Sequence, residues 1–389
     1  MVASPRFSTD PFTVRLGVFY AAYFIFIGVE LPFFPLFLEA RGLDAQAIGL
    51  VVAAPMLVRI VATPFAAHQA DRWRALKAAL VIGSAVATVA MTAVGLAPTE
   101  ATIFAAFVVA AFAFSPLLAL TDAYALSGLA PRGRAYGPVR LWGSVAFIVG
   151  NILGGALLHV LAPGHLIWLI VAALAAATVA ALALLPLDDA NTEAPPVAMP
   201  SPKRLLTDPV FLAVAAACAL IQGSHALYYS FSTMQWRAAG LDGALIGTLW
   251  GLGVVAEVVL FAFSGRLPPP LPPTALILIG GAGAVIRWTA MAFDPPVALL
   301  PVLQLLHAAS FAATHLGLMG FLARTVPRQM LATAQGVVAT AMGLVNGAGT
   351  FASGFAYAAS GSRAYLLMAA MALAGVVSAL YAGRRWHAS

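Results

Sequence analysis

Charged side chains set within long apolar runs are the groups in this sequence best able to do chemistry. Three are acids and three are bases: Glu30, Asp122 and Glu257, and Arg59, Arg140 and Arg287. A charge at the centre of a bilayer costs about 2.5–3.5 kcal/mol on insertion scales, so each of these groups needs a partner or water. Because acids and bases balance, they can pair with one another, but the sequence does not say which pairs form.

Asp122 and Arg140 flank one predicted loop, on adjacent apolar runs, where the two side chains can meet. They would form either a structural ion pair or a pair that opens to receive a polar substrate group, and both readings stay open. Ser144, Phe147 and Asn151 follow Arg140 at helical spacing on one face. Such a stripe is more typical of a cavity wall than of a face toward lipid.

Two further stripes of polar and aromatic residues contain histidines. One holds Gln222, His225, Tyr228, Tyr229 and Ser232, and the other holds Gln304, His307, Phe311, Thr314 and His315. A single histidine on an apolar helix is usually part of a hydrogen-bonded structure. Two stripes in corresponding regions, each with aromatic residues, instead favour a shared polar cavity.

The sequence lacks the motifs of an enzyme. It has no GxSxG, HExxH, P-loop or CxxC pattern, and its single cysteine, Cys218, can form neither an internal disulfide nor a zinc site. We therefore expect no catalytic residues, no metal and no cofactor. Without a nucleotide site of its own, transport by this chain would be driven by an ion gradient, above all a proton gradient, or by the gradient of the substrate.

The composition predicts a polytopic membrane protein. Of 389 residues, 62% are hydrophobic and 9% are charged, with a mean hydropathy of +0.95; an ordinary soluble domain has roughly 25% charged residues. This excludes a soluble enzyme, a secreted disulfide scaffold and a disordered protein.

Twelve apolar runs are long enough to cross a bilayer. They are residues 13–38, 48–67, 78–96, 101–126, 139–161, 166–185, 209–236, 245–263, 274–293, 297–323, 330–359 and 365–381.

The basic residues predict the orientation. Fourteen of the 20 Lys and Arg lie near the termini or in connections after even-numbered runs, and three, Arg41, Arg237 and Arg363, lie on the other side. By the positive-inside rule both termini are cytoplasmic, in the inner membrane. The net charge of +6 is then explained by topology and anionic lipid rather than by nucleic acid.

An internal repeat divides the chain into two halves. Residues 42–49 read GLDAQAIG and residues 240–247 read GLDGALIG, with five of eight positions identical. The same offset of 198 places Arg59 opposite Glu257. We predict an all-α fold of two six-helix bundles, 1–186 and 208–389, joined by a polar cytoplasmic linker at 187–207. A parallel repeat of this kind places the substrate site near the midplane between the halves.

The whole chain resembles the major facilitator superfamily. The loop from Ala67 to Arg74, AHQADRWR, is similar to the signature loop of that superfamily, although Ala67 replaces its usual glycine. The resemblance implies that Asp71 and Arg72 brace the cytoplasmic gate, and that the protein acts as a monomer.

Several stretches resemble the phenylpropionate permease branch and its relatives, the lactose permease and nucleoside–proton symporter branches. These are residues 28–35, 140–144, 224–229, 249–257 and 287–288, together with His307, Phe311 and His315. The resemblance implies a substrate-binding pair, Asp122 and Arg140, and a proton-coupling group, Glu257, Arg287 and His307. Lactose permease has a second carboxylate one turn after the histidine, where this chain has Ser310, so Glu257 or Glu30 becomes the candidate proton carrier.

We therefore expect a proton-coupled symporter of a small organic solute, which the resemblance suggests is an aromatic carboxylate such as 3-phenylpropionate. Arg140, Arg59 or Arg287 would take the carboxylate, with Glu30 and His225 nearby. Phe33, Phe147, Tyr228, Tyr229 and Phe311 would enclose the ring. The alternatives are a sugar or nucleoside symporter with Asp122 accepting hydroxyl hydrogen bonds, a drug/proton antiporter, and a membrane scaffold or receptor that transports nothing.

Overall fold

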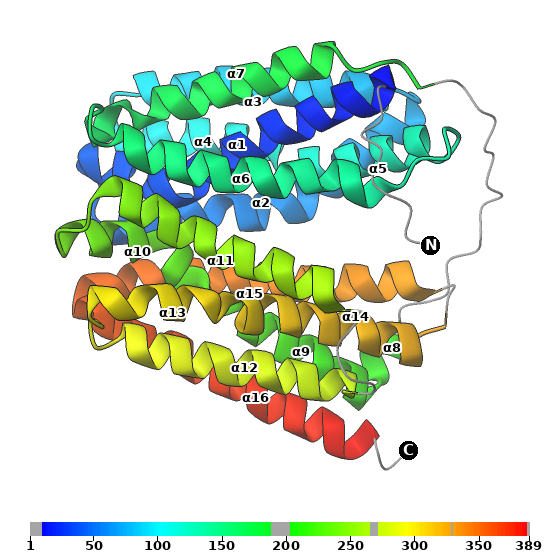
Figure 1. Ribbon diagram of the computed structural model, residues 1–389, viewed down its shortest axis with the longest axis vertical. Coiled ribbons are helices and arrows are strands. Elements are labelled where there is room, and N and C mark those ends of the chain that lie inside the picture. The colour runs from blue at the N-terminus through cyan, green and yellow to red at the C-terminus, as the bar shows by residue number, and fades with distance from the viewer. Residues whose placement is uncertain (1–9, 188–202, 265–270, 328–329, 387–389) are drawn as a thin grey trace.

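Helices make up the regular structure in the computed structural model, which describes residues 10–187, 203–264, 271–327 and 330–386 (Figure 1). No strand occurs in these ranges. The first half contains α1 (Pro11–Ala40), α2 (Ala45–Arg72), α3 (Leu76–Leu96), α4 (Glu100–Phe114), α5 (Leu117–Leu129), α6 (Tyr136–Leu157) and α7 (Leu166–Leu182). The second contains α8 (Lys203–Thr207), α9 (Pro209–Gly223), α10 (Ala226–Ala238), α11 (Gly243–Phe263), α12 (Pro273–Met291), α13 (Leu300–Leu305), α14 (Thr314–Thr325), α15 (Leu331–Ser360) and α16 (Tyr365–Trp386).

The all-helical membrane fold is confirmed. The described residues form 11 continuous apolar segments long enough to cross a membrane, and the last of these, Thr333–Trp386, contains two helices. Because α15 has 30 residues and α16 has 22, each can cross alone, which gives the twelve crossings expected. The predicted linker lies mostly outside the described residues, apart from Leu187 and the short helix α8 at its end.

Three crossings are interrupted in the middle, although the sequence predicts each as one run. Pro116, which has no backbone N–H, separates α4 from α5. Ser224 and His225 separate α9 from α10, and both side chains bond the Ile221 carbonyl oxygen. A π-helix at Ala308–Ala313 lies between α13 and α14. Such breaks in membrane helices occur where the backbone lines or supports a polar site.

The repeated octets occupy equivalent places at the starts of α2 and α11. Gly42 and Gly240 both have φ near +87° (87° and 86°), a left-handed backbone that favours glycine. Asp44 and Asp242 then accept a hydrogen bond from the backbone N–H three residues later, as helix N-caps do. The repeat therefore encodes the same turn and the same helix start in each half.

The two bundles lie side by side in Figure 1, with α1–α7 in one and α9–α16 in the other. They touch through α2 with α15, α6 with α11 and α1 with α10. Backbones approach most closely at the end where α6 finishes and α11 begins: a Cβ on Gly155 would overlap the Gly243 carbonyl oxygen, and one on Gly247 would overlap that of Asn151. Glycine at these positions is therefore what allows the bundles to close.

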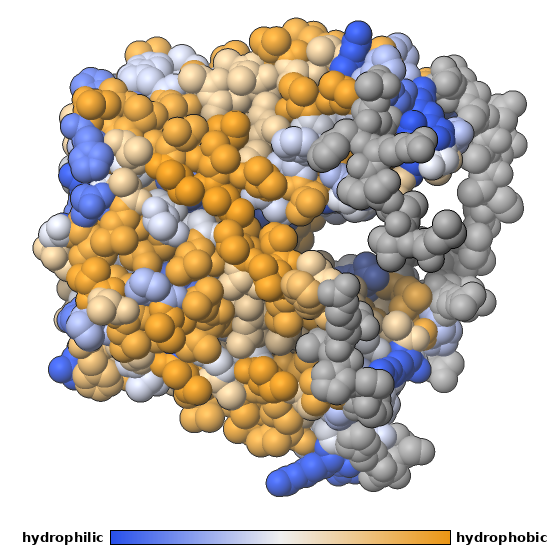
Figure 2. All heavy atoms as spheres, in the orientation of Figure 1, coloured by the Kyte–Doolittle hydropathy of each residue, from blue (hydrophilic) through white to orange (hydrophobic). Residues whose placement is uncertain are grey.

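The second close crossing pairs the start of α2 with the end of α15. A Cβ on Gly49 would lie 2.8 Å from the Gly354 Cα atom. Gly49 and Gly247 are the final glycines of the two repeated octets, so the repeat also supplies both tight crossings. At the opposite end, where α1 begins and α16 finishes, Figure 2 shows a hollow between the bundles. With cytoplasmic termini, as the charges predict, this conformation is open inward.

Candidate functional site

A buried arginine organises the polar interior of the second bundle. Arg287 on α12 is fully buried; its Nη1 lies 3.0 Å from His307 Nδ1, and its Nη2 donates to Gln304 Oε1 at 2.7 Å. The guanidinium also lies over the rings of Tyr228 (4.5 Å) and Trp288 (4.6 Å). Tyr228 donates to the same Gln304 oxygen at 2.8 Å. Neutral dipoles and aromatic faces therefore hold this charge, rather than a carboxylate.

The arginine decides which nitrogen of His307 carries the proton. A guanidinium has no acceptor, so Nδ1 of His307 must accept, and the proton of the neutral ring sits on Nε2. That nitrogen faces Glu257 Oε2 on α11, 3.8 Å away. While Arg287 stays in place, a proton entering this group has one acceptor left, the Glu257 carboxylate. The expected proton-coupling trio of Glu257, Arg287 and His307 is thus brought together.

His225 packs against this network, with its ring 5.4 Å from that of His307. It is fully buried, with Nε2 3.0 Å from Ser310 Oγ and Nδ1 3.1 Å from the Gln222 carbonyl oxygen. Because a carbonyl only accepts, Nδ1 is the donor and Nε2 accepts from the serine. Ser310, which lies three residues after His307, is thus the hydrogen-bond partner of His225.

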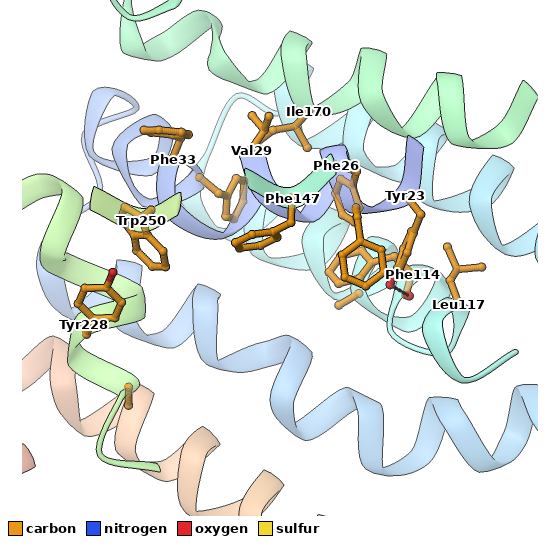
Figure 3. Close-up of a cluster of buried hydrophobic side chains, with 14 of the residues drawn as sticks. Tyr23, Phe26, Val29, Phe33, Phe114, Leu117, Phe147, Ile170, Tyr228 and Trp250 are labelled. Carbon is orange, nitrogen blue, oxygen red and sulfur yellow. Dashed lines mark hydrogen bonds between the residues drawn. The ribbon is translucent and has the colours of Figure 1, made fainter. Parts of the chain in front are cut away.

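A cavity of 490 Å³ lies between the two bundles. It is within the size range of small-molecule sites. Its charged lining residues are Glu30, Arg59 and Asp122, and its aromatic ones are Tyr23, Phe26, Phe34, Phe114 and Tyr229. Figure 3 shows Tyr23, Phe26 and Phe114 close together, with Tyr23 donating to the Phe114 carbonyl oxygen at 3.2 Å. That hydrogen bond satisfies a backbone group beside the α4–α5 break.

Asp122 and Arg140 do not form the expected ion pair. Asp122 Oδ1 accepts from the hydroxyls of Tyr20 (2.6 Å) and Tyr136 (2.8 Å). Arg140 instead lies over the rings of Phe24 (4.2 Å) and Tyr20 (5.7 Å). Two hydroxyls stabilise the carboxylate and two aromatic faces stabilise the guanidinium, so neither charge needs the other.

Replacing Asp122 with Ala is expected to destabilise the protein, because the buried hydroxyl of Tyr20 loses its acceptor. Stranding such a group costs about 1–3 kcal/mol, or a fall in Tm of about 2–6 °C. Asp122→Asn keeps an acceptor oxygen and should lose less than half of that. Thermal unfolding in detergent measures both, with Ser127→Ala on the exposed face of α5 as control. Equal shifts for Ala and Asn would contradict the role assigned to the acceptor.

The other predicted residues divide between the cavity and its surroundings. Glu30, Arg59 and Tyr229 reach the cavity, and Arg59 forms no ion pair within the described ranges. Phe34 lines the cavity whereas Phe33, predicted to do so, packs against Gly154, and Phe147 packs against α1 at Gly28. Phe311 stacks on His307 at 5.3 Å.

The predicted gate residues lie at the end of α2. Arg72 is exposed there, and the side chain of Asp71 lies outside the described part, so their role as a gate stays a prediction.

Several residues of this interior are not among those that the sequence pattern predicts. Tyr20 and Tyr136 hold Asp122, Trp250 packs against Tyr228 at 4.6 Å (Figure 3), and Asn346 and Thr350 of α15 line the cavity. Tyr136 stands four residues before Arg140 on the same helix, which is a signal that spacing alone could have revealed. The two α15 residues are also four positions apart on one helix, and Thr350 Oγ1 donates to Asn346 Oδ1 at 3.3 Å, so their spacing is a similar signal.

Comparison with known proteins agrees with this architecture. Residues 13–368 match the model of the MFS_1 like family. A protein of Escherichia coli (strain K12) described as a probable 3-phenylpropionic acid transporter is 31% identical over 365 residues, which cover 92% of this chain and 94% of the relative. The maltose permease of Geobacillus stearothermophilus is 25% identical over 327 residues, covering 82% and 80%.

Solved transporter structures share the fold. The nucleoside transporter NupG superposes with a TM-score of 0.80 at 16% identity, covering 95% of this chain and 98% of that one. A bacterial homolog of the human lysosomal transporter Spinster, in an inward-facing and unoccupied conformation, gives 0.77 at 14%, covering 97% and 98%. The chain therefore belongs to the MFS_1 like family and is a multi-pass membrane transporter of the major facilitator superfamily, not an enzyme.

Proposed function

We propose that this protein is a proton-coupled symporter of small aromatic carboxylates such as 3-phenylpropionate. The observation that carries the proposal is the cavity between the bundles, which combines an arginine with five aromatic rings, together with the partly buried Glu257–His307 pair, which can take a proton. The name of the Escherichia coli relative supports the substrate class. The protein would act as a monomer in the inner membrane, with both termini in the cytoplasm.

The way the bundles meet supports alternating access. Both bundles contribute to the cavity, since α1, α2 and α5 face α10 and α15 across it. Closing the end that carries the termini would enclose a bound solute. Opening the other end requires the glycine crossings of α6 with α11 and of α2 with α15 to separate. The substrate would thus face one side of the membrane at a time.

Proton coupling would use Glu257. When ionised it is a charge in the membrane interior that faces His307 Nε2, and a proton removes that charge. Because a neutral carboxyl is cheaper to enclose than a carboxylate, loading Glu257 favours the closure that carries substrate across.

A sugar or nucleoside symporter fits the geometry less well. That reading needs Asp122 to accept hydrogen bonds from substrate hydroxyls, and its Oδ1 already accepts from Tyr20 and Tyr136, which leaves Oδ2 for a substrate. No described residue favours drug antiport or a scaffold role over uptake.

Uptake into proteoliposomes tests the proposal. With a more acidic exterior, labelled 3-phenylpropionate should accumulate, and a protonophore should abolish the accumulation. Unlabelled cinnamate should compete, whereas maltose and uridine should not. Competition by maltose or uridine without competition by cinnamate would assign the other substrate class. Absence of movement of any of these solutes, in protein whose unfolding is cooperative, would contradict transport of them.

A further inference from the structure

Two opposite charges in the cavity have no partner in the described part of the chain. Glu30 on α1 and Arg59 on α2 both line it, and neither makes a hydrogen bond or ion pair with any residue in the described ranges. Asp122, the third charge, is already bonded to two tyrosines, and Arg140 lies over the ring of one of them, Tyr20, at 5.7 Å. Glu30 and Arg59 are therefore the charged groups of the cavity that no described side chain already holds.

Unpartnered hydroxyls lie in the same wall. Thr63 Oγ1 on α2 and Ser115 Oγ at the α4–α5 break are buried, line the cavity, and have no hydrogen-bond partner among the residues that the structure describes. Thr63 follows Arg59 by four residues, so the two share a helix face. An arginine beside two free hydroxyls is a set of donors suited to a carboxylate.

The remaining wall is aromatic. Phe26 lies 5.4 Å from Phe114 and 6.0 Å from Tyr23, measured between ring centroids. Phe34 and Tyr229 also line the cavity. Rings in this arrangement accept a flat aromatic group on their faces or edges. The cavity therefore suits a solute with a carboxylate at one end and a ring at the other.

The charge balance links this site to protons. Glu30 and Arg59 sum to zero when both are ionised, so an incoming carboxylate would add one uncompensated negative charge to a low-dielectric space. One proton on Glu30 restores neutrality, because Arg59 then balances the substrate. The titratable and charged groups that line the cavity with Glu30 are Tyr23, Arg59, Asp122 and Tyr229. Arg140, on the neighbouring α6, lies over the ring of Tyr20. Helix α7, which also packs on α1, has no titratable side chain.

We propose that Arg59 binds the carboxylate of the substrate and that Glu30 takes up one proton from water as the carboxylate binds. The assignment rests on the proposed transport of aromatic carboxylates. The proton forms an O–H bond on Glu30, no other bond changes, and both the proton and the carboxylate are released when the cavity opens to the other side.

Calorimetric titration of the purified protein tests this with two probes, 3-phenylpropionate and its neutral amide. From about pH 6 to about pH 8 the acid stays ionised. Buffers of different ionisation enthalpy then report the protons taken up per ligand. Wild type is expected to bind one proton with the acid and none with the amide, and its affinity for the acid should fall as the pH rises.

Matched variants assign the residues. Glu30→Gln should bind the acid without proton uptake and with the same affinity across the pH range. Arg59→Gln should lose about 10- to 100-fold in affinity for the acid, while binding the amide within about threefold of wild type shows that the site is intact. Glu39→Gln is the control for Glu30→Gln, because Glu39 is an exposed residue of the same helix, α1. Arg324→Gln on α14 is the control for Arg59→Gln, and both controls should behave as wild type.

Full proton uptake by Glu30→Gln, or unchanged acid affinity in Arg59→Gln, would overturn the assignment while leaving the proposed function standing. Failure of wild type to bind the acid would instead defeat the proposed function, and this assignment with it. A fall in affinity of Arg59→Gln for acid and amide alike would also count against Arg59 as the carboxylate anchor.

Discussion

Glu257→Gln is expected to abolish accumulation of 3-phenylpropionate driven by a membrane potential alone, at equal pH on both sides. If one proton on Glu30 balances the carboxylate, a second proton on Glu257 gives the loaded carrier one net positive charge. An inside-negative potential of 100 mV is worth about 2.3 kcal/mol per charge, which is about 50-fold accumulation. Glutamine keeps the volume and a contact with His307 but carries no proton, so the accumulation ratio should fall to about one.

Proteoliposomes with a potassium diffusion potential measure this directly. Exchange of labelled for unlabelled substrate should persist in Glu257→Gln, because loading and reorientation remain possible. Glu100→Gln at the exposed start of α4 is the matched control and should accumulate normally. Wild-type accumulation by Glu257→Gln under the same potential would remove Glu257 from the coupling mechanism.

Gly247→Val is expected to force open the end of the protein at which α6 crosses α11, which is closed in this structure. Uptake should fall strongly as a result. A Cβ at this position would overlap the Asn151 carbonyl oxygen, and backbone on both sides leaves nothing flexible to move aside. Overpacking a tight contact costs about 1–3 kcal/mol, which shifts the equilibrium between closed and open states by about 10- to 100-fold. Transport requires both states, so the rate of uptake should fall as the closed state becomes less populated.

Cysteine labelling reports the shift independently of uptake. Cys218 is fully buried and can be replaced with Ala, after which Leu158→Cys places one thiol beside the Gly243 contact. Maleimide should react with it about tenfold faster in Gly247→Val. Gly336→Val on α15 is the control, because a Cβ there meets no atom within 4 Å. Slow labelling in Gly247→Val, as in wild type, would show that the crossing tolerates the side chain.

Local chemistry made much of the fold predictable from the sequence. Apolar length determines which segments can cross a bilayer, and the observed helices begin and end within a few residues of most predicted runs. Each repeated octet encodes its own turn, through Gly42 or Gly240, and its own N-cap, through Asp44 or Asp242. These features involve neighbours in the chain, so spacing alone reveals them.

Partners across the bundles could be decided only by the tertiary structure. The sequence determined that Glu30, Arg59, Asp122, Arg140, Glu257 and Arg287 lie within membrane segments, because hydropathy is a property of each run. It did not determine that Asp122 would bond two tyrosines instead of Arg140, or that Arg287 would fix the tautomer of His307. Those pairings depend on helix rotation and on the depth of each side chain, which packing between distant segments sets.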